Sequence, residues 1–256
     1  MKAKKKQIIP AAVILLLLIA VICFFQFTGT GYCFSVPFRH GFREIAPNIY
    51  INKGNAGDPD GMLSIIEAAK ERDAAFYGSM QCLDETLIII CDDAKISARI
   101  GEKDTTTVPF PVKRNYICVS NEYCILDILA HELTHAELHS RLNDKALHKI
   151  PTWFNEGLAT QNDYREQYSA EQWEQQTENG RLAVPVTDMD TRAEFYAGTA
   201  EDRRYRYMCA KHEVASWLEV HSVQGLLDLL EGLNAGGDFD TLYGTPLSDA
   251  AADNKA

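Results

Sequence analysis

Two histidines and a glutamate within one short segment are the residues of this chain best suited to shared chemistry. They form the pattern His131-Glu132-Leu133-Thr134-His135. A helix turns by about 100° per residue, so residues four apart lie on one face, one turn apart. His131 and His135 can therefore direct two imidazoles at one ion, and Glu132 can reach a water molecule beside it. Two nitrogen ligands, a general base and an open coordination position are what a zinc hydrolase requires.

The motif lies in a segment that is expected to form a buried helix. Apolar residues recur around it at helical spacing. They are Ile125, Ile128, Leu129, Leu133, Leu138 and Leu142.

A catalytic zinc site needs a third protein ligand, with water in the fourth position. His139 cannot supply it, because two helical turns, roughly 12 Å at 1.5 Å per residue, separate it from His131. A metzincin-type site needs Gly three residues and His six residues after His135. Leu138 and Arg141 occupy those positions, so that class is excluded.

Two segments further along the chain could supply the third ligand. An aspzincin-type site needs Gly-Thr-x-x-Asp, but Gly244-Thr245-Pro246-Leu247 is followed by Ser248. The other source is a glutamate on a second helix. Glu156 lies 21 residues after His135, and Pro151 or Thr152 can begin a helix around it.

The second motif is Pro151-Thr152-Trp153-Phe154-Asn155-Glu156-Gly157-Leu158-Ala159. With the first, it resembles the gluzincin metallopeptidases, especially the bacterial peptidase MA-like branch, in which a Trp-x-x-Glu-Gly-x-Ala helix follows the His-Glu-x-x-His helix. The two motifs together cover about 30 residues. The resemblance implies a zincin-like fold, with Glu132 as general base and acid. It also implies a zinc ion bound by His131, His135 and Glu156.

The sequence departs from this family at one position. Many gluzincins place an Asp four residues after the glutamate ligand, where it hydrogen-bonds a ligand histidine. Thr160 stands there in this chain. Such partners tune metal affinity, so we expect either that the hydrogen-bond partners of the ligand histidines differ from those of the family, or that Asp127 or Asp163 takes over that role.

The implied reaction is hydrolysis of a peptide bond by a zinc-activated water. Glu132 would take a proton from that water and pass it to the leaving amine. The oxyanion needs a donor besides zinc, and related enzymes use a Tyr or His from the helical C-terminal part. We expect Tyr207 to be this donor. Neighbouring Arg203, Arg204 and Arg206 could bind a substrate carboxylate, although basic runs more often face water.

Two other functions are compatible with the same residues. One is a catalytically silent, zinc-stabilised binding module of the cell envelope, against which the intact Glu132 argues. The other is a hydrolase of non-peptide amides or esters, which the site chemistry also permits.

The elements that must position the motifs predict an α+β fold. Strands are expected at 48–52, 87–91, 105–108 and 115–120, and a helix at 60–77. Pro109 and Pro111 favour an edge or loop position for the third strand. Helices are expected at 170–178, 203–220, 223–233 and 239–243. The prediction is a small mixed β-sheet with helices, the active-site helix, and then a helical C-terminal subdomain.

The expected organisation is a membrane anchor at 1–27, or an uncleaved signal, a linker at 28–47, a metallopeptidase domain at 48–248 and a tail at 249–256. Within the domain, 48–142 is the sheet-containing lobe and 143–248 the helical lobe. Residues 8–27 are almost continuously apolar, about the length that crosses a bilayer, and lysines precede them. We therefore expect a single-pass cell-membrane protein with a cytoplasmic N-terminus and an extracytoplasmic catalytic domain.

Charge and cysteine content limit the partners. The chain has a net charge of −11, and the part after the first six residues carries 21 basic against 36 acidic side chains. Such an acidic body repels nucleic acid, so the expected partner is a peptide or protein substrate. Six cysteines follow the apolar run, and Cys82 with Cys91, or Cys118 with Cys124, are plausible local disulfides in an oxidising compartment.

Overall fold

The structure, a computed structural model, describes residues 5–100, 105–110 and 114–244. Its contacts divide the chain into two compact units. The sheet unit comprises Met1–Met62 and Glu85–Cys124, and the helical unit comprises Leu63–Asp84 and Ile125–Ala256. The sequence placed the boundary between lobes after residue 142. The contacts instead group the motif helix with the helical unit. The segments that pack against it, at 63–84 and beyond 150, also belong to that unit.

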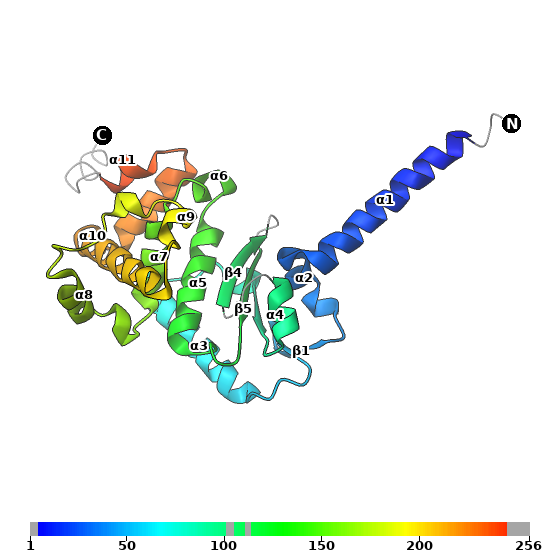
Figure 1. The fold of residues 1–256 in the computed structure, drawn as a ribbon, viewed down its shortest axis with the longest axis horizontal. Coiled ribbons are helices and arrows are strands. Elements are labelled where there is room, and N and C mark those ends of the chain that lie inside the picture. Colours follow the sequence, from blue (N-terminus) through cyan, green and yellow to red (C-terminus); the bar gives the residue numbers. More distant parts are fainter. Residues whose placement is uncertain (1–4, 101–104, 111–113, 245–256) are drawn as a thin grey trace. The chain divides into compact units, whose positions relative to one another are not determined.

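One mixed sheet of five strands forms the centre of the sheet unit (Figure 1). The strands are β1 (Phe42–Ala46), β2 (Ile49–Asn52), β3 (Thr86–Ile90), β4 (Thr105–Phe110) and β5 (Arg114–Val119), in the order β1-β2-β3-β5-β4. β3 is parallel to β2 and β5, and the two outer pairs are antiparallel. Every residue of β3 is buried, as its unbroken apolar run requires. The α+β class and the mixed sheet are confirmed.

Pro109 fits the sheet because β4 is an edge strand. It is paired opposite Asn115, and β4 continues to Phe110. Pro111 lies outside the described residues.

The segment expected to be a linker, 28–47, is folded. It contains α2 (Gly29–Ser35), a 3₁₀ turn at Val36–Phe38 and β1. Side chains of α2 and α4 (Ala94–Ile100) pack on strand residues in one apolar cluster. That cluster is Tyr32, Cys33, Val36, Phe42, Leu87, Ile89, Cys91, Ile100, Tyr116 and Cys118.

The N-terminal apolar run forms α1 (Lys5–Phe27). Among the described residues, no single helix is long and apolar enough by itself to cross a membrane. One bent pair, Ala12–Phe27 with Gly29–Phe38, meets the same length and composition criteria, with an angle of 89° between its parts. The first four residues and the tail at 249–256 lie outside the described residues.

The helical unit contains most of α3 (Pro59–Tyr77), and then α5 (Leu126–Arg141), α6 (Asp144–Leu147), α7 (Thr152–Ala159), α8 (Ala170–Thr177), α9 (Arg192–Phe195), α10 (Ala200–Asn234) and α11 (Phe239–Tyr243). Short 3₁₀ turns at Leu83–Glu85, Thr160–Asn162, Glu166–Tyr168 and Val186–Asp188 complete the elements. The two helices expected at 203–220 and 223–233 are both present within α10, whose helical backbone is interrupted between them at Ser222, where φ is 60° and ψ is 176°.

The core of the helical unit forms around α7 and α10. Trp153 and Phe154 of α7 are buried in it with Phe239 and Tyr243 against them. A Cβ atom on Gly157 would lie 2.4 Å from the carbonyl oxygen of Ala210. Only glycine therefore allows α7 to approach α10 this closely.

None of the seven cysteines, all of which lie among the described residues, forms a disulfide. The local pairs suggested by sequence are not formed. Instead, the Cys33 and Cys118 sulfur atoms, 85 residues apart in sequence, lie 3.5 Å from one another inside the sheet unit.

Candidate metal centre

The motif helix α5 is held in place by buried polar contacts on several sides. The carboxylate of Glu137, which has no exposed surface, accepts hydrogen bonds from the backbone N–H groups of Gln81 and Cys82. Arg141 donates to the same carboxylate at 2.7 Å. Thr134 donates to Asp73 at 3.1 Å. These contacts fix the rotation of α5 about its axis and thus the direction of both histidines.

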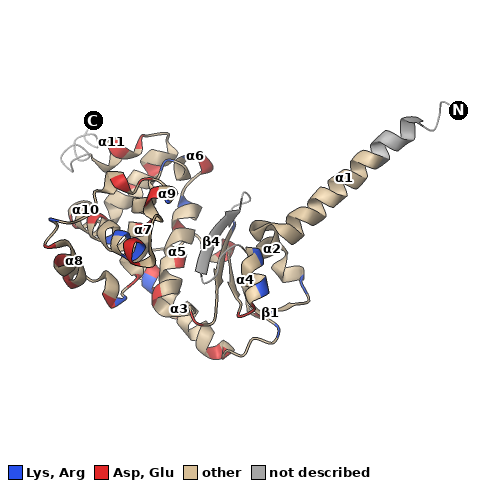
Figure 2. Ribbon diagram, in the orientation of Figure 1, with Lys and Arg blue, Asp and Glu red and all other residues tan. Residues whose placement is uncertain are grey.

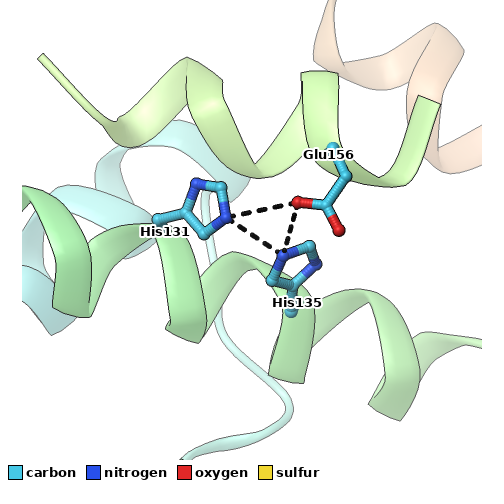
Figure 3. A group of neighbouring side chains, drawn as sticks. All are labelled: His131, His135 and Glu156. Carbon is cyan, nitrogen blue, oxygen red and sulfur yellow. Dashed lines mark hydrogen bonds and ion pairs between the residues drawn. The ribbon is translucent and has the colours of Figure 1, made fainter. Parts of the chain in front are cut away.

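Three side chains from α5 and α7 converge on one point (Figure 3). The Nε2 atoms of His131 and His135 are 3.1 Å apart. Oε2 of Glu156 lies 3.5 Å from the first and 3.4 Å from the second. All three residues are buried, with at most 9% of their surface exposed. The structure thus brings together the three ligands predicted from sequence.

The spacing of these atoms fits a metal ion. Tetrahedral bonds of about 2.0–2.1 Å place ligand atoms about 3.3–3.4 Å apart, close to the three distances observed. Within the described residues, Oε2 of Glu156 is buried and accepts no hydrogen bond. A buried carboxylate oxygen of this kind requires compensation. The group could therefore hold a metal ion.

The charges of His135 and Glu156 shift each other's pKa. Burial is the largest single effect on the pKa of His135 and lowers it, but the Glu156 and Glu132 carboxylates and the contact with Asn155 together raise that pKa to about 9. Burial likewise acts to raise the pKa of Glu156, and the charge of His135 holds it well below its ordinary value. Glu156 is thus an anion in a buried position, which is the state of a metal ligand.

Asn155 supplies the histidine-orienting contact that sequence reasoning assigned to an aspartate. Its Oδ1 accepts a hydrogen bond from Nδ1 of His135 at 2.9 Å, which holds the ring so that Nε2 points at the position where a metal would bind. Asn155 directly precedes Glu156, and this adjacency in the second motif was a signal that could have revealed it.

The residues expected in that role are engaged elsewhere. Asp127 pairs with Arg72 at 2.6 Å, and Asp163 pairs with Arg165 at 2.5 Å. Thr160 donates its hydroxyl proton to the backbone carbonyl oxygen of Glu156. An ionised aspartate at this position could not make that hydrogen bond. Asp127 and Asp163 therefore do not take over the role, and the other alternative, a different partner for the ligand histidine, is what the structure has.

Two tyrosines border the group. Tyr196, which sequence reasoning missed, donates its hydroxyl to Oε1 of Glu156 at 2.6 Å. Tyr207, the expected oxyanion donor, lies with its ring centroid 6.0 Å from that of His131, and its hydroxyl is 3.4 Å from that of Tyr196. Burial raises the pKa of both phenols, so both remain protonated donors. Tyr196 directly follows the short helix α9, 40 residues after its partner Glu156, and no sequence pattern marks it.

The remaining motif residues have clear positions. Glu132 is buried on α5, with 5% of its surface exposed. His139 stacks on His135 at a ring-centroid distance of 6.4 Å but is not part of the converging group. Burial lowers the pKa of His139 to about 3, so this imidazole is neutral.

Comparisons with protein-family profiles, with curated proteins and with solved structures gave no match to this chain.

Proposed function

We propose that this protein is a zinc-dependent peptidase of gluzincin type with a zincin-like catalytic fold. The observation that carries the proposal is the convergence of His131, His135 and Glu156 in one buried group, with Glu132 on the same helix. Two imidazoles and one carboxylate form a ligand set that zinc uses in hydrolases.

The proposed metal ligands are Nε2 of His131, Nε2 of His135 and Oε2 of Glu156. When bound, zinc supplies a Lewis acid that polarises a carbonyl and acidifies a water molecule. Glu132 accepts the proton of the attacking water, whose oxygen bonds to the scissile carbonyl carbon. Glu132 then donates the proton to the amine nitrogen as the carbon–nitrogen bond breaks.

The placement of the protein at a membrane is part of the same proposal. The apolar run of α1 follows a lysine-rich N-terminus, which favours a cytoplasmic start and a catalytic part on the other side. The proposed partner is a peptide or protein of the extracytoplasmic space.

The test compares the zinc-loaded protein with Glu132→Gln on a peptide library, with products identified by mass spectrometry. The exchange keeps size and burial but removes the base, so we expect unchanged zinc content and a loss of several orders of magnitude in rate. Glu231→Gln, an exposed exchange on α10, serves as the matched control. Removal of zinc with a chelator should abolish cleavage, and added zinc should restore it.

Two results would overturn the proposal. The first is full peptidase activity in Glu132→Gln. The second is a zinc-loaded wild-type protein that cleaves no peptide in the library.

A further inference from the structure

A cavity of about 530 Å³ lies in the helical unit beside the first turns of α10. Its lining includes Tyr168, Ala200, Arg203, Arg204 and Tyr207. The volume is within the range of about 300–1,000 Å³ that small-ligand sites occupy.

An aromatic wall connects this cavity with the metal group. The Tyr207 ring lies 6.0 Å from that of His131 and 5.9 Å from that of Tyr168, measured between ring centroids. Tyr168 and Tyr207 both line the cavity. A peptide bound at the metal group could therefore place a neighbouring residue in the cavity.

The charge at the cavity is unusual for this acidic chain. Arg203 and Arg204 face one acidic lining residue, Glu201, which lies 3.7 Å from Arg204. A long, exposed pair of this kind is weak and leaves the guanidinium available. Figure 2 shows basic residues on this part of α10, within a unit otherwise rich in acidic side chains.

Arg206 differs from Arg203 and Arg204 in how firmly its guanidinium group is held by the protein. Arg206 donates to the carbonyl oxygens of Phe195 and Ala197, at 3.1 and 2.6 Å, and so holds the loop before α10. Arg203 reaches a carbonyl, that of Gly198, only at 3.4 Å. Arg203 and Arg204 are therefore more weakly engaged than Arg206, so their guanidinium groups can exchange these long contacts for a ligand.

We propose that this cavity is a specificity subsite for a carboxylate of the substrate, held by Arg203 and Arg204 against the Tyr168–Tyr207 wall. This inference rests on the proposed peptidase function. Guanidinium groups bind carboxylates through paired hydrogen bonds. The carboxylate can come from an Asp or Glu side chain or from a peptide C-terminus.

The first experiment measures cleavage. A zinc-loaded full-length protein digests a randomised peptide library, and the residues around each cleaved bond are counted. We expect Asp, Glu or a free C-terminus to be enriched at one fixed position, and Arg203→Gln with Arg204→Gln to reduce that enrichment at least about fivefold. Arg181→Gln, an exposed arginine outside the cavity, should leave it unchanged.

The second experiment measures binding without chemistry. Zinc-free Glu132→Gln protein is titrated with three probes: Ac-Ala-Glu-Ala-NH2, Ac-Ala-Ala-Ala-OH and the neutral Ac-Ala-Gln-Ala-NH2. We expect at least one anionic probe to bind about fivefold or more tightly than the neutral one. The preferred probe identifies a side-chain or a terminal carboxylate. The double arginine exchange should remove the difference.

The outcomes separate the two proposals. Absence of any cleavage by the wild type would contradict the peptidase function. Cleavage without acidic enrichment, or enrichment and binding that persist in the double variant, would overturn the subsite while leaving the peptidase function intact.

Discussion

Oδ1 of Asn155 lies 2.9 Å from Nδ1 of His135, so α7 both supplies one proposed metal ligand and orients another. Glu156 is the next residue in the chain. The position of α7 therefore determines both where the Glu156 carboxylate lies and how the His135 imidazole is oriented. Any shift of α7 changes both.

Replacing Asn155 with Ala should weaken zinc binding by about 10- to 100-fold, the usual effect of losing a partner of a ligand histidine. The His135 ring would lose the acceptor that fixes its tautomer. Competition with a chromophoric chelator measures this affinity. Gln176→Ala, which removes an exposed amide on α8, is the control and should bind zinc as the wild type does. Equal affinities of Asn155→Ala and wild type would contradict the role assigned to Asn155.

Replacement of Tyr196 and replacement of Tyr207 should have different effects, the first on zinc affinity and the second on kcat. Tyr196→Phe removes the 2.6 Å hydrogen bond to Glu156 and should lower zinc affinity about tenfold. Tyr207→Phe leaves that bond in place and should keep zinc affinity within about twofold. If Tyr207 stabilises the oxyanion, kcat should fall about 10²- to 10³-fold. Zinc titration and steady-state kinetics on both variants decide this, and an unchanged kcat in Tyr207→Phe rules that residue out.

Gly157→Ala should destabilise the protein and its metal site together. The added Cβ would lie 2.4 Å from the Ala210 carbonyl oxygen, so α7 must move away from α10. We expect a loss of about 1–3 kcal/mol in the free energy of unfolding, after the gain of up to about 1 kcal/mol in helix propensity. Denaturant unfolding measures it. Gly41→Ala meets no atom within 4 Å and should stay within about 0.5 kcal/mol of wild type.

The buried carboxyl of Asp73 predicts a pH dependence of stability. Burial raises its pKa to about 8, and the negative charge of Glu137 adds to that effect, while a hydrogen bond from Thr134 and the charges of Arg72 and His135 oppose it. The folded protein therefore holds a proton that the unfolded chain releases near pH 4. Between roughly pH 4 and pH 8, this group makes stability fall by up to about 1.4 kcal/mol per pH unit.

Asp73→Asn should remove this contribution. The amide oxygen can still accept the Thr134 hydrogen bond, and an amide does not titrate. Unfolding of both proteins between pH 5 and pH 8, at about one-unit steps, gives the difference between them, in which other titrating groups cancel. The variant should gain on the wild type as pH rises. A constant difference would mean that Asp73 is already ionised at the lower pH.

Local patterns in the sequence predicted most of the elements. The apolar runs indicated β2, β3 and β5, and α11 was expected at 239–243, the residues that the structure gives it. The segment 28–47 was missed because glycine, proline and aromatic residues there show no periodicity. Tyr32 and Cys33 of α2, and Val36 of the 3₁₀ turn after it, pack into a cluster with residues more than 50 positions away.

At the candidate site, residues on two contiguous motifs could be predicted and those from elsewhere could not. His131, His135 and Glu156 follow from helical spacing and the family resemblance. Tyr196 reaches Glu156 from 40 residues away, and the two engaged aspartates depend on Arg72 and Arg165. Such partners are decided by tertiary contacts.

The division of the chain into two interleaved units sets the order in which they can be completed during synthesis. Residues 85–124 of the sheet unit separate the two stretches of the helical unit. When translation reaches Cys124, the sheet unit has all its residues, whereas α3 still lacks the core into which Tyr77 packs. Domains generally fold as their residues emerge. The proposed zinc ligands are therefore complete only once Glu156 has emerged, and the helix that carries Glu156 finds its packing partner only after α10 has followed.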